Sequence, residues 1–373
     1  MTLIAHIADV HLGYAQYGLE EREEDVYEAF EEAVELMKKE HVDMLLIAGD
    51  LFDSPKPPIK ALMKARKLLT DLRNRGVEIF HILGDHELPR RLSELPPTAL
   101  LSDSSRHVAL RVTESSNGIA VTGLDRTPPT RMKESLESLK KLTEEIKEKY
   151  SKSILLAHVP AHRPEKGFEL LPPGYGYYAL GHEHERKVLS KAGAPAAYPG
   201  SMEILSSAEI DAWERNGKGF LIVDYSKSEP LIHEVNLKSV RPQRMIEVKT
   251  SLLDDAIQDA LNWTASLPKK PIIHLRILGE TLDRASISRK LQETLSGKVL
   301  YYRHEFVEEG GGEVEAESIR GLDVRSMIRE YMALRGFGED EIELALEIYD
   351  AYLARGAEEV ERVIARKLEE KVK

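Results

Sequence analysis

Residues 3–11, Leu-Ile-Ala-His-Ile-Ala-Asp-Val-His, join a short apolar run to an Asp-x-His motif. Apolar runs of this length are typical of buried strands. Six more occur in the first 240 residues, at 44–48, 78–83, 119–122, 154–157, 177–180 and 220–223. Amphipathic stretches separate several of them, at 22–39, 59–74 and 132–149. Strands that alternate with helices predict a layered α/β domain.

Four more motifs stand at the downstream ends of these runs. They are Gly49-Asp50-Leu51-Phe52-Asp53, Gly84-Asp85-His86-Glu87, His158, and Gly181-His182-Glu183-His184. Loops beyond the carboxyl ends of strands in an α/β sheet converge on one crevice, so we expect these side chains to meet. Each glycine that precedes a ligand is expected to let the backbone turn sharply off its strand. One such motif would mean little, but five at matching strand ends predict a functional site.

The side chains gathered in this way are carboxylates and imidazoles, and the chain has no cysteine. Disulfides and thiolate metal sites are therefore excluded. Carboxylates and imidazoles suit manganese, iron or zinc, and magnesium less well. Two divalent ions that share a bridging carboxylate can hold a phosphodiester, activate water and stabilise the leaving oxygen. We therefore predict a metal-dependent phosphoesterase whose ligands are Asp9, His11, Asp50, Asp85, His158, His182 and His184.

Three neighbouring residues are candidates for supporting roles. His86 adjoins Asp85, and we expect it to reach the phosphate without binding metal, as proton donor or as stabiliser of transition-state charge. Asp53 either orients a ligand imidazole from behind or is a surface or capping aspartate. His162 lies four residues after His158 and is a further candidate.

After Arg241 the pattern restarts on a smaller scale. Strands at 245–249, 272–278 and 298–304 alternate with helices at 252–266 and 284–295, which predicts a small α/β domain. Residues 307–321 are acidic, contain three consecutive glycines and predict a flexible linker. Three amphipathic stretches, 324–335, 340–355 and 358–371, predict a helical arm that either binds a partner or docks on its own chain.

The net charge of −12 is unevenly distributed along the chain. Residues 20–40 and 307–373 are strongly acidic, whereas residues 54–75 hold seven basic side chains and one aspartate. DNA binding needs a local basic patch and not a basic total, so the net charge does not exclude it. The basic stretch is either such a patch or a solvated helix face. The N-terminal residues show neither a basic leader nor a long apolar stretch, so we expect a cytoplasmic protein without a membrane span.

At these motifs the sequence resembles the calcineurin-like metallophosphoesterase superfamily. Residues 6–14, 48–52, 177–182 and 198–201 are similar to the SbcD-type DNA repair nucleases, the meiotic-recombination-eleven family, and to its archaeal members above all. The resemblance is strong over residues 1–225 and continues in layout beyond them. It implies an α/β/β/α nuclease domain at 1–240, a DNA-capping domain at 241–306, and an arm at 322–373 that grips the coiled coil of an SMC-like ATPase.

The resemblance also implies an activity and a division of the ligands. It implies a homodimeric, manganese-dependent nuclease of DNA double-strand break repair, with 3′–5′ exonuclease activity on duplexes and endonuclease activity on single strands. Iron, zinc or magnesium would also fit the site. His86 would be the catalytic histidine. One ion would be bound by Asp9, His11, Asp50 and His184, and the other by Asp50, Asp85, His158 and His182.

Two positions depart from the family pattern. Asp85 replaces the family's asparagine, which raises the ligand charge from −2 to −3 and should weaken the pull of the metals on water. Asp53 stands where many eukaryotic and archaeal members carry histidine, so a supporting role ascribed to that histidine is absent.

Two other functions remain open, as does the oligomeric state. A phosphoesterase for small substrates would share the motifs but have no use for the small domain and the arm. A scaffold with weakened catalysis is suggested by Asp85 alone. The apolar residues at 59–72 and 95–101 could form a dimer interface or pack inward.

Overall fold

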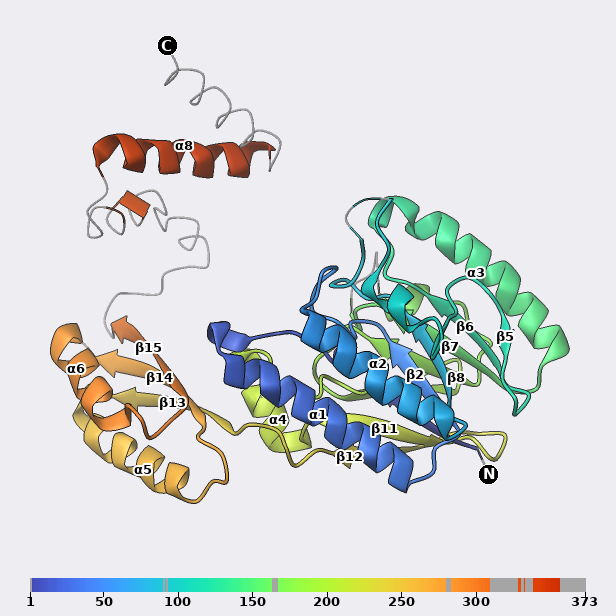
Figure 1. The fold of residues 1–373 in the computed structure, drawn as a ribbon, viewed down its shortest axis with the longest axis horizontal. Helices are drawn as coiled ribbons and strands as arrows, with labels where there is room; N and C mark the ends of the chain where they lie inside the picture. Colours follow the sequence, from blue (N-terminus) through green and yellow to red (C-terminus); the bar gives the residue numbers. More distant parts are fainter. Residues whose placement is uncertain are drawn as a thin grey trace, which may run out of the picture. The chain divides into compact units, whose positions relative to one another are not determined.

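The computed structural model describes residues 2–89, 91, 93–162, 167–279, 283–308, 328–329, 332 and 338–355. The chain divides into two compact units, Met1–Val307 and Glu308–Lys373, and each is described by itself (Figure 1). The larger unit holds two sheets of a layered domain and the sheet of a small α/β domain. Among the described residues, no helix is both long and apolar enough to cross a bilayer.

The first sheet has six strands in the order β12-β11-β1-β2-β3-β4. Strands β1 to β4 are parallel, whereas β11 is antiparallel to both β1 and β12. The carboxyl ends of β1, β2 and β3 therefore lie at one edge of the sheet. The strands are β1 (Leu3–Ile7), β2 (Met44–Ala48), β3 (Glu78–Ile82), β4 (Arg106–His107), β11 (Gly219–Asp224) and β12 (Leu231–Asn236).

The second sheet also has six strands, in the order β5-β6-β7-β8-β10-β9. Its four central strands are parallel, and the two edge strands run antiparallel to their neighbours. The strands are β5 (Thr113–Glu114), β6 (Ala120–Leu124), β7 (Ser153–His158), β8 (Tyr177–Gly181), β9 (Lys187–Lys191) and β10 (Ala194–Tyr198).

Helices cover the outer face of each sheet, as Figure 1 shows for α1 and α2 on one side and α3 on the other. The order of layers is therefore α/β/β/α, as the family resemblance implied. The helices are α1 (Glu20–Lys39), α2 (Ile59–Asn74), α3 (Pro129–Lys149) and α4 (Ile210–Asn216). Short 3-10 turns are η1 (Gln16–Gly18), η2 (Pro97–Leu101), η3 (Phe168–Leu170), η4 (Ser207–Glu209) and η5 (Thr250–Leu252).

Successive side chains of the central strands enter different apolar layers. In β2, Leu45 and Ile47 pack toward α1 and α2, whereas Met44 and Leu46 pack between the two sheets. Side chains of a strand point alternately to its two faces, so a strand buried on both faces must be apolar throughout. This is why β1, β2, β7 and β8 are visible in the sequence as continuous apolar runs.

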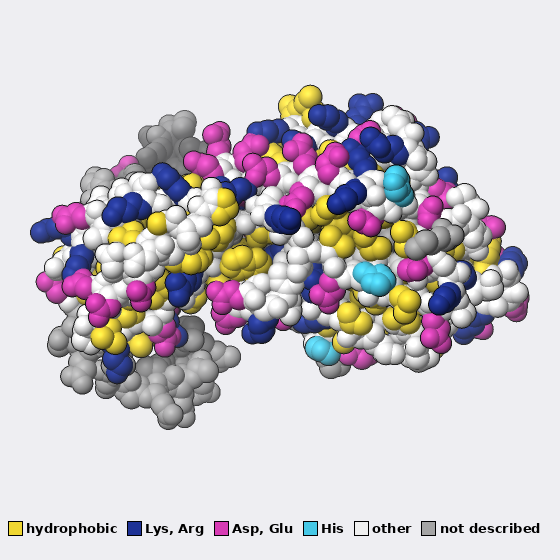
Figure 2. All heavy atoms as spheres, turned by 90° about the horizontal axis from the view of Figure 1, so that it is seen from below, with side chains coloured by type: hydrophobic (Ala, Val, Ile, Leu, Met, Phe, Trp, Pro, Cys, Tyr) yellow, Lys and Arg dark blue, Asp and Glu magenta, His cyan; other side chains and the backbone are white. Residues whose placement is uncertain are grey.

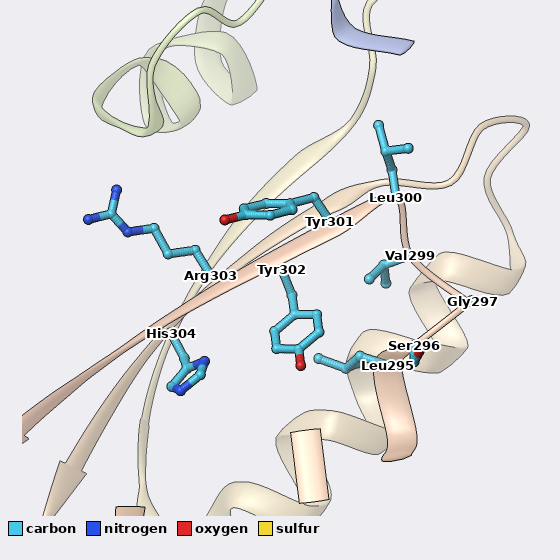
Figure 3. A pocket seen from close by; sticks show the side chains of 9 residues that line it. All are labelled: Leu295, Ser296, Gly297, Val299, Leu300, Tyr301, Tyr302, Arg303 and His304. Carbon is cyan, nitrogen blue, oxygen red and sulfur yellow. The ribbon is translucent and has the colours of Figure 1, made fainter. Parts of the chain in front are cut away.

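The small α/β domain has the predicted βαβαβ order around its own core. Its last strand starts later than predicted and runs on to Glu308, so the predicted linker cannot begin at residue 307. Figure 3 shows neighbouring side chains of this strand on opposite sides of the ribbon. Tyr302 packs toward the core, and Tyr301 stacks on Tyr17 of η1 with 4.5 Å between ring centroids. The elements are β13 (Gln243–Lys249), α5 (Leu253–Ala265), β14 (Ile272–Gly279), α6 (Arg284–Leu295) and β15 (Tyr301–Glu308).

A buried network of charges joins the small domain to α1. Both oxygens of the Asp25 carboxylate accept hydrogen bonds from Arg241, at 2.5 and 2.9 Å, and Oδ2 also accepts one from Arg22 at 2.6 Å. Lys269 Nζ lies 3.1 Å from Asp25 Oδ1. Asp25 is 1% exposed, so its charge depends on these cations for compensation.

In the second unit the structure describes one long helix, α8 (Glu339–Arg355), which agrees with the helix predicted at 340–355. Ile342 and Leu346, one turn apart, are buried. The helices predicted at 324–335 and 358–371 fall largely or wholly outside the described residues, as do residues 309–321 of the predicted linker.

Candidate metal centre

The predicted ligands come from loops that follow strands of both sheets. Asp9 and His11 follow β1, Asp50 follows β2 and Asp85 follows β3 in the first sheet. In the second sheet, His158 ends β7, and His182 and His184 follow β8. The two sheets face each other, so these loops meet at one end of the sandwich.

The structure brings all seven predicted ligands into groups whose ligand atoms lie within 4.8 Å of one another. One group is Asp9, His11 and His184, and another is Asp85, His158 and His182. A third contains Asp9, Asp50 and His158 and connects the first two. This arrangement is two adjoining clusters with Asp50 between them.

Three of the histidines are held through Nδ1, which leaves Nε2 for a ligand. Nδ1 of His11 lies 3.0 Å from Asp53 Oδ1, Nδ1 of His158 lies 2.8 Å from the Ala48 carbonyl oxygen, and Nδ1 of His184 lies 3.0 Å from Glu209 Oε1. Metal-bound imidazoles are usually oriented in this way. Nε2 of both His11 and His158 is buried without a hydrogen-bond partner. Buried polar atoms rarely remain unpaired, so these residues fit a bound metal.

The backbone at the site is strained. Asp9, His11 and Asp50 have φ of 51°, 54° and 51°, and His182 has φ of 102°. Positive φ is uncommon outside glycine, and such residues gather at functional sites because surrounding contacts enforce them. Here Asp9 N–H donates to the Gly49 carbonyl at 3.1 Å, and the His182 N–H donates to the Asp9 carboxylate at 3.1 Å.

The glycines of the motifs serve two purposes. Gly49 has φ of +92°, as expected for a sharp turn, and a Cβ there would lie 2.4 Å from His158 Nδ1. Gly84 does not have positive φ, so the prediction that it allows a sharp turn of the backbone is wrong. A Cβ at Gly84 would lie 2.2 Å from Asp50 Oδ1. Close approach of neighbouring ligands explains this glycine.

His86 lies at the rim of the site. Its side chain is 47% exposed, its ring centroid is 4.5 Å from that of His11, and its Nδ1 is 3.1 Å from the Asp53 carbonyl oxygen. The neighbouring Asp53 carboxylate, together with the charge of Asp50, raises the pKa of His86 to about 9. The backbone N–H of His86 donates to Asp50 Oδ1 at 2.8 Å and fixes that carboxylate.

Sequence reasoning missed a buried group behind His184. Glu209 Oε2 accepts hydrogen bonds from Lys218 Nζ at 2.5 Å and from Ser201 Oγ at 3.1 Å, while Oε1 faces His184. Burial alone would raise the pKa of Glu209, but the His184 hydrogen bond and the Lys218 charge outweigh it and lower the pKa to about 2. The only signal in the sequence was Ser201, in the motif at 198–201.

One further residue of the motifs takes up a position here, whereas the candidate His162 does not. Glu87 is fully buried, and its carboxylate accepts from Gly84 N at 3.2 Å and from Phe52 N at 3.3 Å, which ties two ligand loops together. Burial raises the pKa of Glu87 to about 8. His162 does not belong to the site, because its side chain is 75% exposed and it joins none of the clusters.

The basic stretch at 54–75 pairs with the acidic helix beside it. Lys60 contacts Glu24, and Lys64 Nζ lies 2.5 Å from Glu31 Oε1. These pairs favour a solvated helix face over a DNA-binding patch for this stretch. Figure 2 likewise shows basic and acidic side chains interspersed on the face that it draws.

Comparisons with known proteins agree with this geometry. Residues 2–186 match the calcineurin-like phosphoesterase family. The chain is similar to the DNA double-strand break repair protein Mre11 of Saccharolobus solfataricus, with 35% identity over 93% of this chain and 94% of that protein. It is 31% identical to the Sulfurisphaera tokodaii protein of that name over 93% and 92% of the two chains. The identity to the Methanocaldococcus jannaschii protein of that name is 30%, over 94% of each chain.

Proposed function

The chain belongs to the Mre11 family of DNA double-strand break repair proteins, and we propose that it hydrolyses DNA phosphodiesters at the centre described above. It is a nuclease with a metallophosphoesterase domain. One observation carries the choice of DNA as substrate. Similarity to the repair proteins extends over 93% of the chain, far beyond the phosphoesterase match at residues 2–186. A phosphoesterase for small substrates would share only that first part.

The proposal assigns two divalent ions to the seven clustered ligands. Asp50 would be shared between the two ions, with manganese as the expected metal. Bound there, the ions would supply an activated water and stabilise negative charge on the scissile phosphate. The clusters support this assignment, as does the Nε2 atom of His11, which is buried without a hydrogen-bond partner. The first ion would be held by Asp9, His11, Asp50 and His184, and the second by Asp50, Asp85, His158 and His182.

His86 is proposed as the catalytic histidine. Its Nδ1–H donates to the Asp53 carbonyl, which leaves Nε2 for the substrate, and half of its side chain is exposed. In its protonated form the ring can donate a proton to the leaving oxygen. Asp53 and Glu209 hold His11 and His184 in place from behind.

Cleavage of end-labelled duplex and single-stranded DNA tests this function. With Mn²⁺ the chain should shorten duplexes from the 3′ end and nick single strands, and a chelator should abolish both activities. His86→Ala should reduce the rate by about 10² to 10⁴-fold with Mn²⁺ binding unchanged, whereas His233→Ala, an exposed control, should have no effect. Hydrolysis of bis(p-nitrophenyl) phosphate without DNA cleavage would favour the small-substrate alternative. Metal binding without turnover of either substrate would favour the scaffold.

We also propose a homodimer formed through α2 and the segment around η2, two elements that pack against each other. Four large apolar side chains are exposed there, Ile59 (75%), Met63 (68%), Leu95 (79%) and Leu100 (60%). Exposed apolar patches of this kind often mark protein interfaces. Met63→Glu should convert the dimer to a monomer in light scattering, and Val188→Glu, a change at an exposed edge-strand residue, should not. A dimer that survives Met63→Glu would exclude this interface.

The remaining assignments concern the domains and the partner. Residues 1–240 would form the nuclease domain and residues 241–306 the DNA-capping domain. Residues 307–321, apart from the first ones, would form the linker. Residues 322–373 would form the arm that binds an SMC-like coiled-coil ATPase, in a cytoplasmic complex. The amphipathic helix α8 supports this role for the arm. Removal of residues 322–373 should abolish co-purification with that ATPase and leave Mn²⁺-dependent cleavage of DNA intact.

A further inference from the structure

Asp85 divides its two carboxylate oxygens between different partners. Oδ2 faces the metal centre, 2.9 Å from His182 Nδ1 and 3.5 Å from His158 Nε2. Oδ1 faces away from it and accepts a hydrogen bond from Arg126 Nε at 2.5 Å. A neutral asparagine could not pair with a guanidinium in this way while also ligating through its single oxygen.

Arg126 is held firmly at this distance from Asp85. Its backbone N–H donates to the Leu83 carbonyl at 2.8 Å, and the carboxylate of the preceding Asp125 accepts from Leu83 N–H at 2.8 Å. These two contacts bind the segment after β6 to the residue just beyond β3. The Arg126 side chain is 18% exposed, and its Nη1 is buried without a hydrogen-bond partner among the described residues. Arg126 is therefore a fixed charge beside the site.

The charges explain what this arrangement achieves. The ligand set contains three carboxylates, Asp9, Asp50 and Asp85, where the family pattern has two and an asparagine. A guanidinium carries one positive charge. The three carboxylates and Arg126 together carry a net charge of −2. A ligand set with asparagine at position 85 and no neighbouring arginine would carry the same net charge.

We propose that Arg126 is a positioning residue that pairs with Asp85 Oδ1, offsets the charge of the third carboxylate and leaves Oδ2 for the metals. The inference rests on the two-metal centre proposed above. Asp85→Asn would place an amide group, which carries no charge, against the partly buried Arg126 guanidinium. The inference therefore reverses the expectation that the family's asparagine would be the better residue at position 85. An unpaired buried charge is costly, so asparagine should be the poorer residue here unless Arg126 changes as well.

Mn²⁺ titration of the full chain by calorimetry, combined with cleavage rates, tests the inference. Arg126→Gln leaves three uncompensated carboxylates, so Mn²⁺ should bind about tenfold more tightly while kcat falls about tenfold. Asp85→Asn should bind Mn²⁺ about tenfold or more weakly. The double variant Asp85→Asn/Arg126→Gln restores the net charge, and its affinity should return to within about threefold of the unmodified chain. Arg126→Lys keeps the charge and should behave like the unmodified chain.

The controls separate charge compensation from simple structural support. Arg131→Gln changes an exposed arginine five residues away and should alter neither affinity nor rate. If Arg126 only supported the loop, Arg126→Gln would weaken Mn²⁺ binding instead of tightening it, and the double variant would stay as weak as Asp85→Asn. Either result would overturn the inference, provided that thermal melting shows folded variants. The double variant leaves no buried charge unpaired, so its comparison with Asp85→Asn decides the question even if Arg126→Gln unfolds.

The outcome for the unmodified chain distinguishes the two proposals. If it binds two Mn²⁺ ions and cleaves DNA but Arg126→Gln does not tighten binding, only the role of Arg126 is wrong. If it binds no Mn²⁺, the metal centre and the inference that rests on it both fail.

Discussion

Gly49 shows how tightly the site is packed. Its φ of +92° equals that of Gly76, but a Cβ at Gly49 would lie 2.4 Å from His158 Nδ1, whereas one at Gly76 would meet nothing within 4 Å. Gly49→Ala should therefore lower the free energy of unfolding by about 2–4 kcal/mol, and Gly76→Ala by about 1 kcal/mol. Urea denaturation measures both. Equal losses would mean that backbone strain alone, without the His158 contact, explains this glycine.

Glu209 is predicted to control metal affinity without touching the metal. Its carboxylate holds His184 Nδ1 at 3.0 Å, and residues in this position typically change affinity by about 10–100-fold when replaced. Glu209→Gln should weaken Mn²⁺ binding within that range, as measured by titration. Glu185→Gln serves as control, because it changes the residue that follows His184 in the sequence and not the carboxylate at its Nδ1. Unchanged affinity in Glu209→Gln would show that His184 is positioned by other contacts.

The clustered carboxylates and imidazoles could be predicted from the sequence, whereas the residues that hold them in place could not. Each ligand ends or follows an apolar run, so a local pattern marks it. Glu209 and Arg126 act on residues 25 and 41 positions away, and nothing local marks that contact. Glutamate and arginine are residue types that are mostly exposed, so their type indicates exposure until the fold shows that they are buried.

The strands also differed in how well the sequence predicted them. Strands buried on both faces, such as β2 and β8, were predicted almost to the residue. Strands β9 and β12 lie at sheet edges, expose at least every second side chain and contain charged residues, so no apolar run marks them. Strands β4 and β5 have two residues each, which is too short for any periodicity. Tertiary pairing creates these strands, and local sequence preference does not.

The contact between α1 and the small domain should be a major source of stability. Asp25 is buried against Arg22, Arg241 and Lys269. Asp25→Asn removes the anion and leaves buried cations uncompensated, which should cost about 3–5 kcal/mol in urea denaturation. Asp71→Asn removes an exposed partner of Lys38 and should have little effect. If Asp25→Asn is equally mild, the network is solvated and does not join the domains.

At the scale of the whole molecule, the three buried histidines that lie outside the metal clusters predict a loss of stability in acid. Burial lowers the pKa of His6 to about 3, of His81 to about 3 and of His274 to about 4, against 6.5 when unfolded. As the pH falls, the unfolded chain thus takes up protons before the folded chain does. The contribution of these histidines to the free energy of unfolding is therefore full above pH 6.5 and is lost as the pH falls below that value.

Urea denaturation at pH 7 and pH 5 in the presence of a chelator checks this. Between pH 7 and pH 5, the free energy of unfolding of His81→Gln should fall by about 2 kcal/mol less than that of the unmodified chain. His233→Gln, at an exposed position, should lose as much as the unmodified chain. Identical losses in all three would mean that His81 is protonated within the folded protein.

The order in which the chain adds strands to the first sheet also has a consequence during translation. Strand β1 lies between β2 and β11, and Leu3 is opposite Asp224. One edge of β1 therefore waits for a partner that is made 221 residues later. At ribosomal speeds of about 5–20 residues per second, that interval is roughly 10–45 seconds. An unpaired apolar strand edge favours pairing with other chains, so β1 should need protection by a chaperone during this interval.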